Sequence, residues 1–194
     1  MITYTSRLDA ALRRSAWAHE QQGQHRKGTD IPYIIHPVGV MMIASNITDD
    51  EDTLIACLFH DILEDVKPSI YSEDQMRDEF GERVVRIVKD VTKDESGRRS
   101  WSERSREYLT HLLERGVDEA VVVAMADKIH NLTSILVDYE VVGDELWQRF
   151  STKNHADQVW WYESVLEIGR KRQAPALLLE QLAEKVEALK SLAS

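Results

Sequence analysis

Cysteine, proline and glycine are all scarce in this sequence of 194 residues, which has one cysteine, four prolines and eight glycines. The single cysteine, Cys57, excludes an internal disulfide framework, and a reducing cytoplasm is the natural compartment for such a chain. Few turn-forming residues and almost no alternation of apolar and polar positions argue against strands. The long segments that remain have helical periodicity, so we expect an all-α fold.

Positive charge is also in short supply, since 24 lysines and arginines face 34 aspartates and glutamates and give a net charge of −10. This balance lacks the basic surface that binds nucleic acid non-specifically, so we expect no nucleic-acid partner. The N-terminal residues lack a signal-peptide pattern and no apolar run looks long enough to cross a bilayer, so we also expect no membrane partner. With 43% apolar and 30% charged residues, the composition is typical of a soluble globular protein.

No repeat, low-complexity segment or linker divides the chain, and its length suits one domain with a full core. We therefore expect residues 1–194 to form a single compact helical bundle of about eight to ten helices. The helices expected from periodicity and from start and stop signals lie at about 6–22, 36–45, 54–65, 72–79, 81–91, 103–114, 118–138, 152–168 and 174–192.

Residues 54–65 carry the densest group of chemically active side chains. At about 100° per residue, one face of a helix here is apolar. The other face presents His60, Asp61, Glu64 and Asp65 within two turns. Neighbouring carboxylates repel one another, and a bound cation would remove that repulsion. An ordinary solvent-facing polar surface explains the pattern about as well, so both interpretations stay open at this point.

A second acidic residue, Asp127, follows seven apolar residues on a helix that is otherwise suited to burial. A buried carboxylate needs a metal, a cation or several hydrogen-bond donors, so Asp127 is a candidate ligand as well as a candidate structural residue. Asn131 stands one turn later and is expected on the same side of the helix. The adjacent Lys128 is expected not to face Asp127.

Two further places could join a site. His36 stands at a helix start, where a histidine is more often a packing or capping residue than a ligand. Arg26 and Lys27 lie in a loop flanked by glycines, and loop cations are usually just solvated. Beside a metal, however, this pair would suit phosphate groups.

Several short segments occur together in a particular order: Arg26-Lys27, Pro32-Tyr33-Ile34-Ile35-His36-Pro37, His60-Asp61 with Glu64-Asp65, Phe80-Gly81, Val91-Thr92-Lys93 and Ala126-Asp127-Lys128 with Asn131-Leu132. Taken together, they resemble the HD-domain hydrolases of the RelA/SpoT type, over about residues 10–135. The resemblance is specific because it needs the whole ordered set rather than one His-Asp pair. It implies a compact HD-domain helical bundle and a stand-alone small alarmone hydrolase, without the synthetase and regulatory domains of the long family members.

The resemblance implies a manganese site with four ligands, namely His36, His60, Asp61 and Asp127. Two imidazoles and two carboxylates, with positions open for water and substrate, suit Mn²⁺. The resemblance also implies that Glu64 orients or deprotonates the attacking water and that Asp65 assists it. The residues implied to bind the substrate are Arg26, Lys27 and Asn131. Arg98, Arg99 and Lys153 are candidates for further phosphate contacts because of their positions and charge. An ordinary role as solvated surface cations nevertheless explains these three residues better.

The implied activity is hydrolysis of the 3′-pyrophosphate of ppGpp or pppGpp to GDP or GTP and pyrophosphate, so the expected partner is a small-molecule nucleotide. Two alternatives stay open. One is an HD metal phosphohydrolase that acts on another nucleotide, such as NADPH or an adenosine alarmone. The other is a catalytically silent nucleotide-binding sensor, against which the filled ligand and catalytic positions argue. A homo-oligomer stays open as well.

Overall fold

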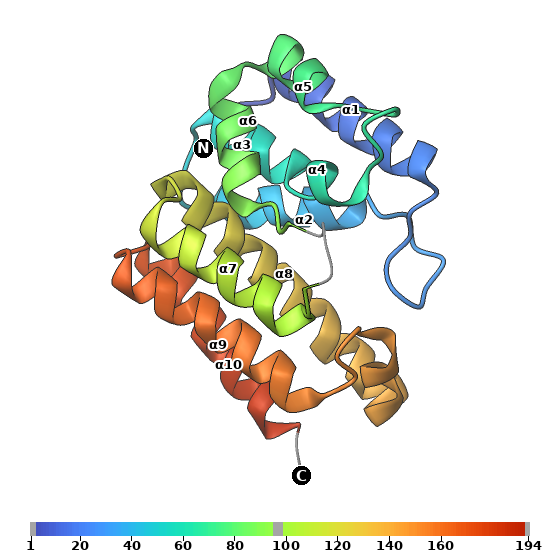
Figure 1. The fold of residues 1–194 in the computed structure, drawn as a ribbon, viewed down its shortest axis with the longest axis vertical. Coiled ribbons are helices and arrows are strands. Elements are labelled where there is room, and N and C mark those ends of the chain that lie inside the picture. Colours follow the sequence, from blue (N-terminus) through green and yellow to red (C-terminus); the bar gives the residue numbers. More distant parts are fainter. Residues whose placement is uncertain (1–2, 95–98, 193–194) are drawn as a thin grey trace.

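The computed structural model describes residues 3–94 and 99–192, and these ranges consist of helices joined by loops (Figure 1). The helices are α1 (Ser6–Gln22), α2 (Ile35–Ala44), α3 (Glu51–Phe59), α4 (Ile62–Asp65), α5 (Glu73–Phe80), α6 (Glu82–Val91), α7 (Trp101–Glu114), α8 (Asp118–Val142), the 3-10 helix η1 (Gly143–Arg149), α9 (His155–Lys171) and α10 (Ala176–Ser191). Extended pairing in these ranges is limited to an isolated bridge between His25 and Pro32. The expected all-α fold is confirmed.

Two helices organise the packing. All residues of α3 from Thr53 to Phe59 are buried, and α3 packs against α1, α2, α6 and α8. The long helix α8 passes between the two halves of the molecule: α2, α3 and α6 pack on it from the N-terminal half, and α9 and α10 pack on it from the C-terminal half (Figure 1). The apolar core therefore runs along α8, and α2 is held against both α3 and α8.

The expectation of one continuous helix over 54–65 is wrong. The α3 helix ends at Phe59 and α4 begins at Ile62, so His60 and Asp61 lie in the turn between them. The reason is local: His60 Nδ1 lies 2.8 Å from the carbonyl oxygen of Cys57, which is the acceptor that the Asp61 N–H would use in a continuous helix. Elsewhere the expected helices begin and end within a few residues of the observed ones, except that α8 runs on to Val142.

The expectation that no segment is long enough to cross a bilayer is also wrong in its literal form. The helical stretch Asp118–Arg149 has the length and the apolar composition of a membrane span. In the structure, however, 61% of its most apolar window is buried inside the protein, as in the core helix of a bundle.

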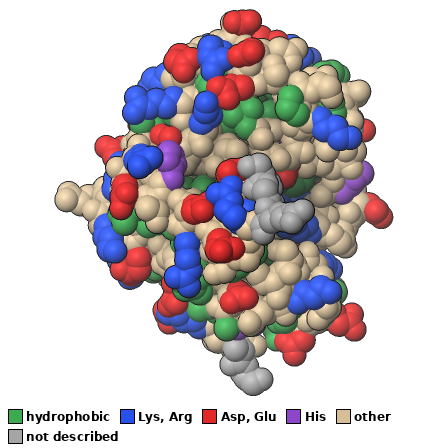
Figure 2. All heavy atoms as spheres, viewed as in Figure 1, with side chains coloured by type: hydrophobic (Ala, Val, Ile, Leu, Met, Phe, Trp, Pro, Cys, Tyr) green, Lys and Arg blue, Asp and Glu red, His purple; other side chains and the backbone are tan. Residues whose placement is uncertain are grey.

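Charged side chains of both signs are interspersed over the face of the molecule seen in Figure 2, with no continuous basic area among the described residues of that face. This arrangement agrees with the net charge of −10. An anionic ligand would therefore have to be bound in a pocket where a few cations converge, rather than on an extended basic surface.

Candidate active site

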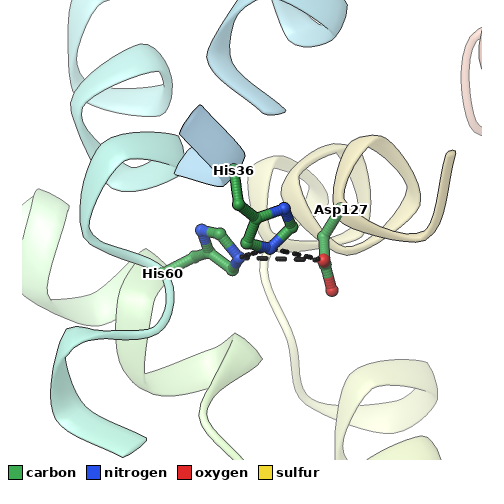
Figure 3. A group of neighbouring side chains, drawn as sticks. All are labelled: His36, His60 and Asp127. Carbon is green, nitrogen blue, oxygen red and sulfur yellow. Dashed lines mark hydrogen bonds and ion pairs between the residues drawn. The ribbon is translucent and has the colours of Figure 1, made fainter. Parts of the chain in front are cut away.

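Four side chains from three separate elements converge at the centre of the molecule. His36 is the second residue of α2, His60 and Asp61 lie in the turn after α3, and Asp127 lies midway along α8. They meet because α2 packs against both α3 and α8. His36, His60 and Asp127 are buried and their side chains point toward one another (Figure 3).

The facing atoms of these side chains lie at the separations that a shared cation requires. His36 Nε2 lies 3.1 Å from His60 Nε2, 3.4 Å from Asp61 Oδ2 and 3.2 Å from Asp127 Oδ1. His60 Nε2 lies 3.0 Å from Asp61 Oδ2 and 3.7 Å from Asp127 Oδ1. A cation with bonds of about 2.1 Å holds two ligands about 3.0 Å apart at right angles and about 3.4 Å apart at tetrahedral angles. His36, His60 and Asp127 therefore offer donor atoms close enough together for one divalent metal ion, and Asp61 Oδ2 lies beside both histidines.

The two carboxylates of this cluster are held in their charged forms despite burial. Burial raises the pKa of Asp61. The positive charge of His60 and a hydrogen bond with His36 outweigh burial, and the pKa of Asp61 lies well below its ordinary value. The pKa of Asp127 is also well below its ordinary value, because Lys128 and both histidines outweigh burial. Burial lowers the pKa of His60, yet Asp61 and Asp127 raise it well above the ordinary value. Without a metal, a proton on His60 therefore offsets part of the charge.

Asp127 has two neighbours on its own helix. Asn131 Nδ2 donates to Asp127 Oδ1 at 2.5 Å, as expected from their spacing. The expectation that Lys128 does not face Asp127 is wrong, because Lys128 Nζ forms an ion pair with Asp127 Oδ2. The four-carbon side chain lets the ammonium group turn back along the helix, and it lies over the ring of Trp161 at 5.1 Å. Backbone spacing alone does not limit such a long side chain.

Glu64 and Asp65, on the short helix α4, lie beside the four-residue cluster. The backbone N–H of Lys93 donates to Glu64 Oε2 at 2.9 Å. Burial and then the charge of Asp61 raise the pKa of Glu64 to about 7. Burial and Asp61 likewise raise the pKa of Asp65 to about 6, although a hydrogen bond from Gln24 opposes this. Carboxylates with a pKa near neutrality can accept a proton at physiological pH, which suits a general base.

A cavity of about 660 Å³ opens over these groups, and its size is that of a nucleotide-sized ligand pocket. Its lining includes the nine residues expected as metal ligands, catalytic carboxylates or main substrate contacts: Arg26, Lys27, His36, His60, Asp61, Glu64, Asp65, Asp127 and Asn131. Arg26 lies over the ring of Tyr33 at 5.8 Å and donates to Asn131 Oδ1 at 2.9 Å. The structure thus brings the predicted site residues together, while their roles stay predictions.

The cavity also contains residues that the sequence analysis did not single out. Lys93, Lys128 and Arg149 add three cations to its wall, and Trp161 adds an aromatic face beneath Lys93 at 4.3 Å. Arg149 reaches the wall from η1, where it pairs with Asp138 at 2.7 Å. Lys93 stands in a matched segment and could have been found there. Arg149 and Trp161 lie past the best-matched region and follow no local pattern.

The three additional cations proposed from charge alone are not among these. Arg98 lies outside the described residues. Arg99 forms ion pairs with Asp94 and Glu107 rather than lining the cavity. Lys153 does not line the cavity either.

Buried histidine and aspartate side chains thus form one cluster at the centre of a helical bundle. The HD domain family model matches residues 11–156, and the protein is a member of the HD domain family.

Curated relatives and solved structures extend this assignment. The guanosine-3′,5′-bis(diphosphate) 3′-pyrophosphohydrolase of Aquifex aeolicus is 29% identical over 170 residues, which are 84% of this chain and 24% of the relative. The enzyme of the same name from Danio rerio is 36% identical over 124 residues, 62% of this chain and 64% of the relative. The chain therefore spans less than two thirds of either relative's length.

Two solved structures resemble the whole fold. One, from work describing a metazoan ortholog of SpoT that hydrolyzes ppGpp, matches with a TM-score of 0.78 and 25% identity over 97% of this chain and 98% of the other. The second, a protein from Listeria monocytogenes, matches with a TM-score of 0.66 and 26% identity over 83% of this chain and 99% of the other.

Proposed function

We propose that this protein removes the 3′-pyrophosphate of ppGpp or pppGpp, giving GDP or GTP and pyrophosphate, with Mn²⁺ as the bound cation. The observation that carries the proposal is the convergence in one cavity of a cation-binding cluster, two carboxylates of raised pKa and several cations. The names of the similar enzymes support the choice of substrate. Because Cys57 is buried and unpaired, and because the substrate is a nucleotide, we place the reaction in the cytoplasm.

The proposed metal ligands are His36, His60, Asp61 and Asp127. Two imidazoles and two carboxylates form a mixed nitrogen and oxygen set that suits Mn²⁺ among the divalent ions. When bound, the cation lowers the pKa of a water molecule and offsets negative charge on a phosphoryl oxygen.

Glu64 is the proposed base. Its Oε2 accepts a hydrogen bond from the Lys93 backbone, which fixes the carboxylate and leaves Oε1 to meet the attacking water. Asp65, on the same turn of α4, keeps a second negative charge beside the water and helps to orient it. A cation bound nearby would lower the pKa of both carboxylates and so favour their ionised forms.

The cations of the cavity are the proposed phosphate-binding groups. Arg26 and Lys27 come from the loop before α2, whereas Lys93 and Arg149 come from other walls of the cavity. The Lys27 ammonium lies over the Phe150 ring at 5.8 Å, and Gly28 packs closely against the Arg149 side chain. Cations that converge from several walls allow a protein of negative net charge to bind a highly anionic nucleotide.

Turnover of ppGpp by the purified protein with Mn²⁺ tests the proposal. Wild type should release pyrophosphate. Asp61→Ala should lose Mn²⁺ binding and activity together, whereas Glu64→Ala should keep Mn²⁺ and lose about 10²–10⁴-fold in kcat. Glu180→Ala, on the exposed side of α10, is the matched control and should match wild type. Absence of pyrophosphate release by wild type with Mn²⁺ bound would overturn the proposal.

The same assay separates the alternatives. NADPH and adenosine alarmones in a substrate panel test for another nucleotide, since the metal ligands would be the same. Tight binding of ppGpp without hydrolysis would instead identify a nucleotide-binding sensor.

A further inference from the structure

A third histidine lies behind His36, on the side away from the cavity. His130, on α8, places its Nδ1 2.9 Å from Nδ1 of His36, with the ring centroids 4.8 Å apart. His130 is not part of the cavity lining, whereas His36 is. We propose that His130 is a positioning residue for the metal centre: its Nδ1 accepts the Nδ1–H of His36 and so keeps the His36 Nε2 lone pair directed at the cation. This inference rests on the proposed metal centre.

A neutral imidazole has one N–H donor and one lone pair, so the two ring nitrogens of His36 must take different roles. His36 Nε2 faces His60 Nε2, Asp61 Oδ2 and Asp127 Oδ1, so a ligand role requires the lone pair at Nε2 and the proton at Nδ1. Without an acceptor behind it, His36 would gain by moving its proton to Nε2 and donating to Asp127 or Asp61. That tautomer blocks the cation. An acceptor at Nδ1 opposes it.

The other histidine of the cluster is fixed differently. His60 Nδ1 lies 2.8 Å from the carbonyl oxygen of Cys57. A carbonyl oxygen can only accept, so the backbone itself keeps a proton on His60 Nδ1, and Nε2 is the nitrogen left to meet a cation. Of these two histidines, His36 is therefore the one whose tautomer depends on a side chain.

Gly39 gives an independent sign that the position of His130 matters. Gly39 stands within α2, where glycine costs about 1 kcal/mol relative to alanine. A Cβ at residue 39 would lie 2.1 Å from His130 Cδ2 and 2.4 Å from His130 Nε2. Any other side chain at residue 39 would push the His130 ring off His36. The glycine therefore leaves the room that the His36–His130 pair needs.

Two measurements test the inference: the tautomer of His36 from ¹⁵N chemical shifts of the imidazole in metal-free protein, and the Kd of Mn²⁺ from competition with a chelating dye. In wild type, His36 should carry its proton on Nδ1. In His130→Phe, which has no acceptor, His36 should shift toward the Nε2–H tautomer. Its Mn²⁺ affinity should then fall about 10–100-fold, as for other lost partners of metal-binding histidines.

The conservative variant His130→Asn should restore both properties, because asparagine Oδ1 takes the place of imidazole Nδ1 and can accept. Gly39→Ala alone should weaken Mn²⁺ binding by displacing the ring. In the His130→Ala background it should add no further loss, because alanine has no ring atoms for the new Cβ to displace. Met42→Ala, on the exposed side of α2, is the control and should match wild type.

An unchanged His36 tautomer and Mn²⁺ affinity in His130→Phe would overturn the inference, as would additive losses from Gly39→Ala and His130→Ala. If His130→Phe fails to fold, the pair of Gly39→Ala measurements decides the question. If wild type binds no Mn²⁺, the proposed metal centre fails, and the tautomer measurement still decides whether His130 orients His36.

Discussion

The Nε2 atoms of His36 and His60 face each other at 3.1 Å. Two imidazole lone pairs cannot lie so close without a positive charge between or beside them. Asp61 and Asp127 raise the pKa of His60 well above its ordinary value despite burial, which favours a proton on that ring in the cation-free protein. A metal ion would take the place of this proton, since a ligand histidine must be neutral. Metal and proton therefore compete for one buried site.

The first prediction is that Mn²⁺ binds more tightly as the pH rises. Because Asp61 and Asp127 raise the pKa of His60 well above its ordinary value, cation binding at this ring competes with protonation, and higher pH favours the cation. The Kd for Mn²⁺ should fall about tenfold per pH unit between pH 6 and 8, which is the slope expected for one released proton. Titration with a competing dye at each pH measures the Kd. Calorimetry in buffers of different ionisation enthalpy measures the number of protons released. A Kd that is independent of pH would contradict the competition.

The second prediction concerns Glu64 and the stability of the metal-free protein. Burial raises the pKa of Glu64 to about 7, from an ordinary value of 4.5. Between these values the folded state binds more protons than the unfolded state, so this residue's contribution to stability falls as the pH rises through that range. Glu64→Gln removes the effect. The variant should therefore gain about 3 kcal/mol in unfolding free energy relative to wild type between pH 4.5 and 8.

Urea unfolding of both proteins in a chelating buffer at several pH values measures this difference. Glu180→Gln, an exposed substitution, should differ from wild type by the same small amount at every pH. A constant difference between Glu64→Gln and wild type would show that Glu64 titrates as an ordinary carboxyl group.

The helical fold and the gathering of the site residues could be predicted from the sequence because both depend on local or ordered patterns. Apolar periodicity indicated the helices, and the ordered segments around His36, His60 and Asp127 indicated a common site. A continuous helix over 54–65, from which the positions of these side chains are expected, is nevertheless absent, because the chain turns at His60 and Asp61. The side chains still meet, since the turn directs both of them toward α8.

What could not be predicted depends on tertiary packing. Arg149 lies more than 120 residues from the loop that it meets, and only the packing of η1 brings its side chain against Gly28. Backbone spacing predicts that Lys128 does not face Asp127, but its long side chain turns back and forms an ion pair with Asp127. His130 stands beside the matched residues, and its contact with His36 becomes visible only when α2 packs on α8.

The third prediction separates substrate binding from metal binding at a pair of residues. Arg26 donates to Asn131 Oδ1, while Asn131 Nδ2 donates to Asp127. Arg26→Ala should therefore raise KM about 10–100-fold, the cost of one charged hydrogen bond, and leave the Mn²⁺ affinity intact. Asn131→Ala should weaken both. Arg26→Lys should recover little, because an ammonium group lacks the planar set of donors that lets the guanidinium contact Asn131 while it lies over the Tyr33 ring. Equal losses of Mn²⁺ affinity in Arg26→Ala and Asn131→Ala would contradict this division.

The last prediction concerns Gln24, which links His19 to Asp65. His19 Nδ1 lies 2.6 Å from Gln24 Oε1, and burial lowers the pKa of His19, so its neutral ring donates to that oxygen. The Gln24 amide N–H₂ then points to Asp65 and lowers the pKa of that carboxyl group.

Gln24→Leu removes the donor, so the pKa of Asp65 should rise and the acid limb of kcat/KM should move to higher pH. Gln24→Glu should move it further, because a second carboxylate repels Asp65. Gln21→Leu, on the exposed face of α1, should leave the pH profile where it is in wild type. If both Gln24 variants also keep the wild-type pH profile, then the pKa of Asp65 does not depend on Gln24, or the ionisation of Asp65 does not limit the rate at low pH.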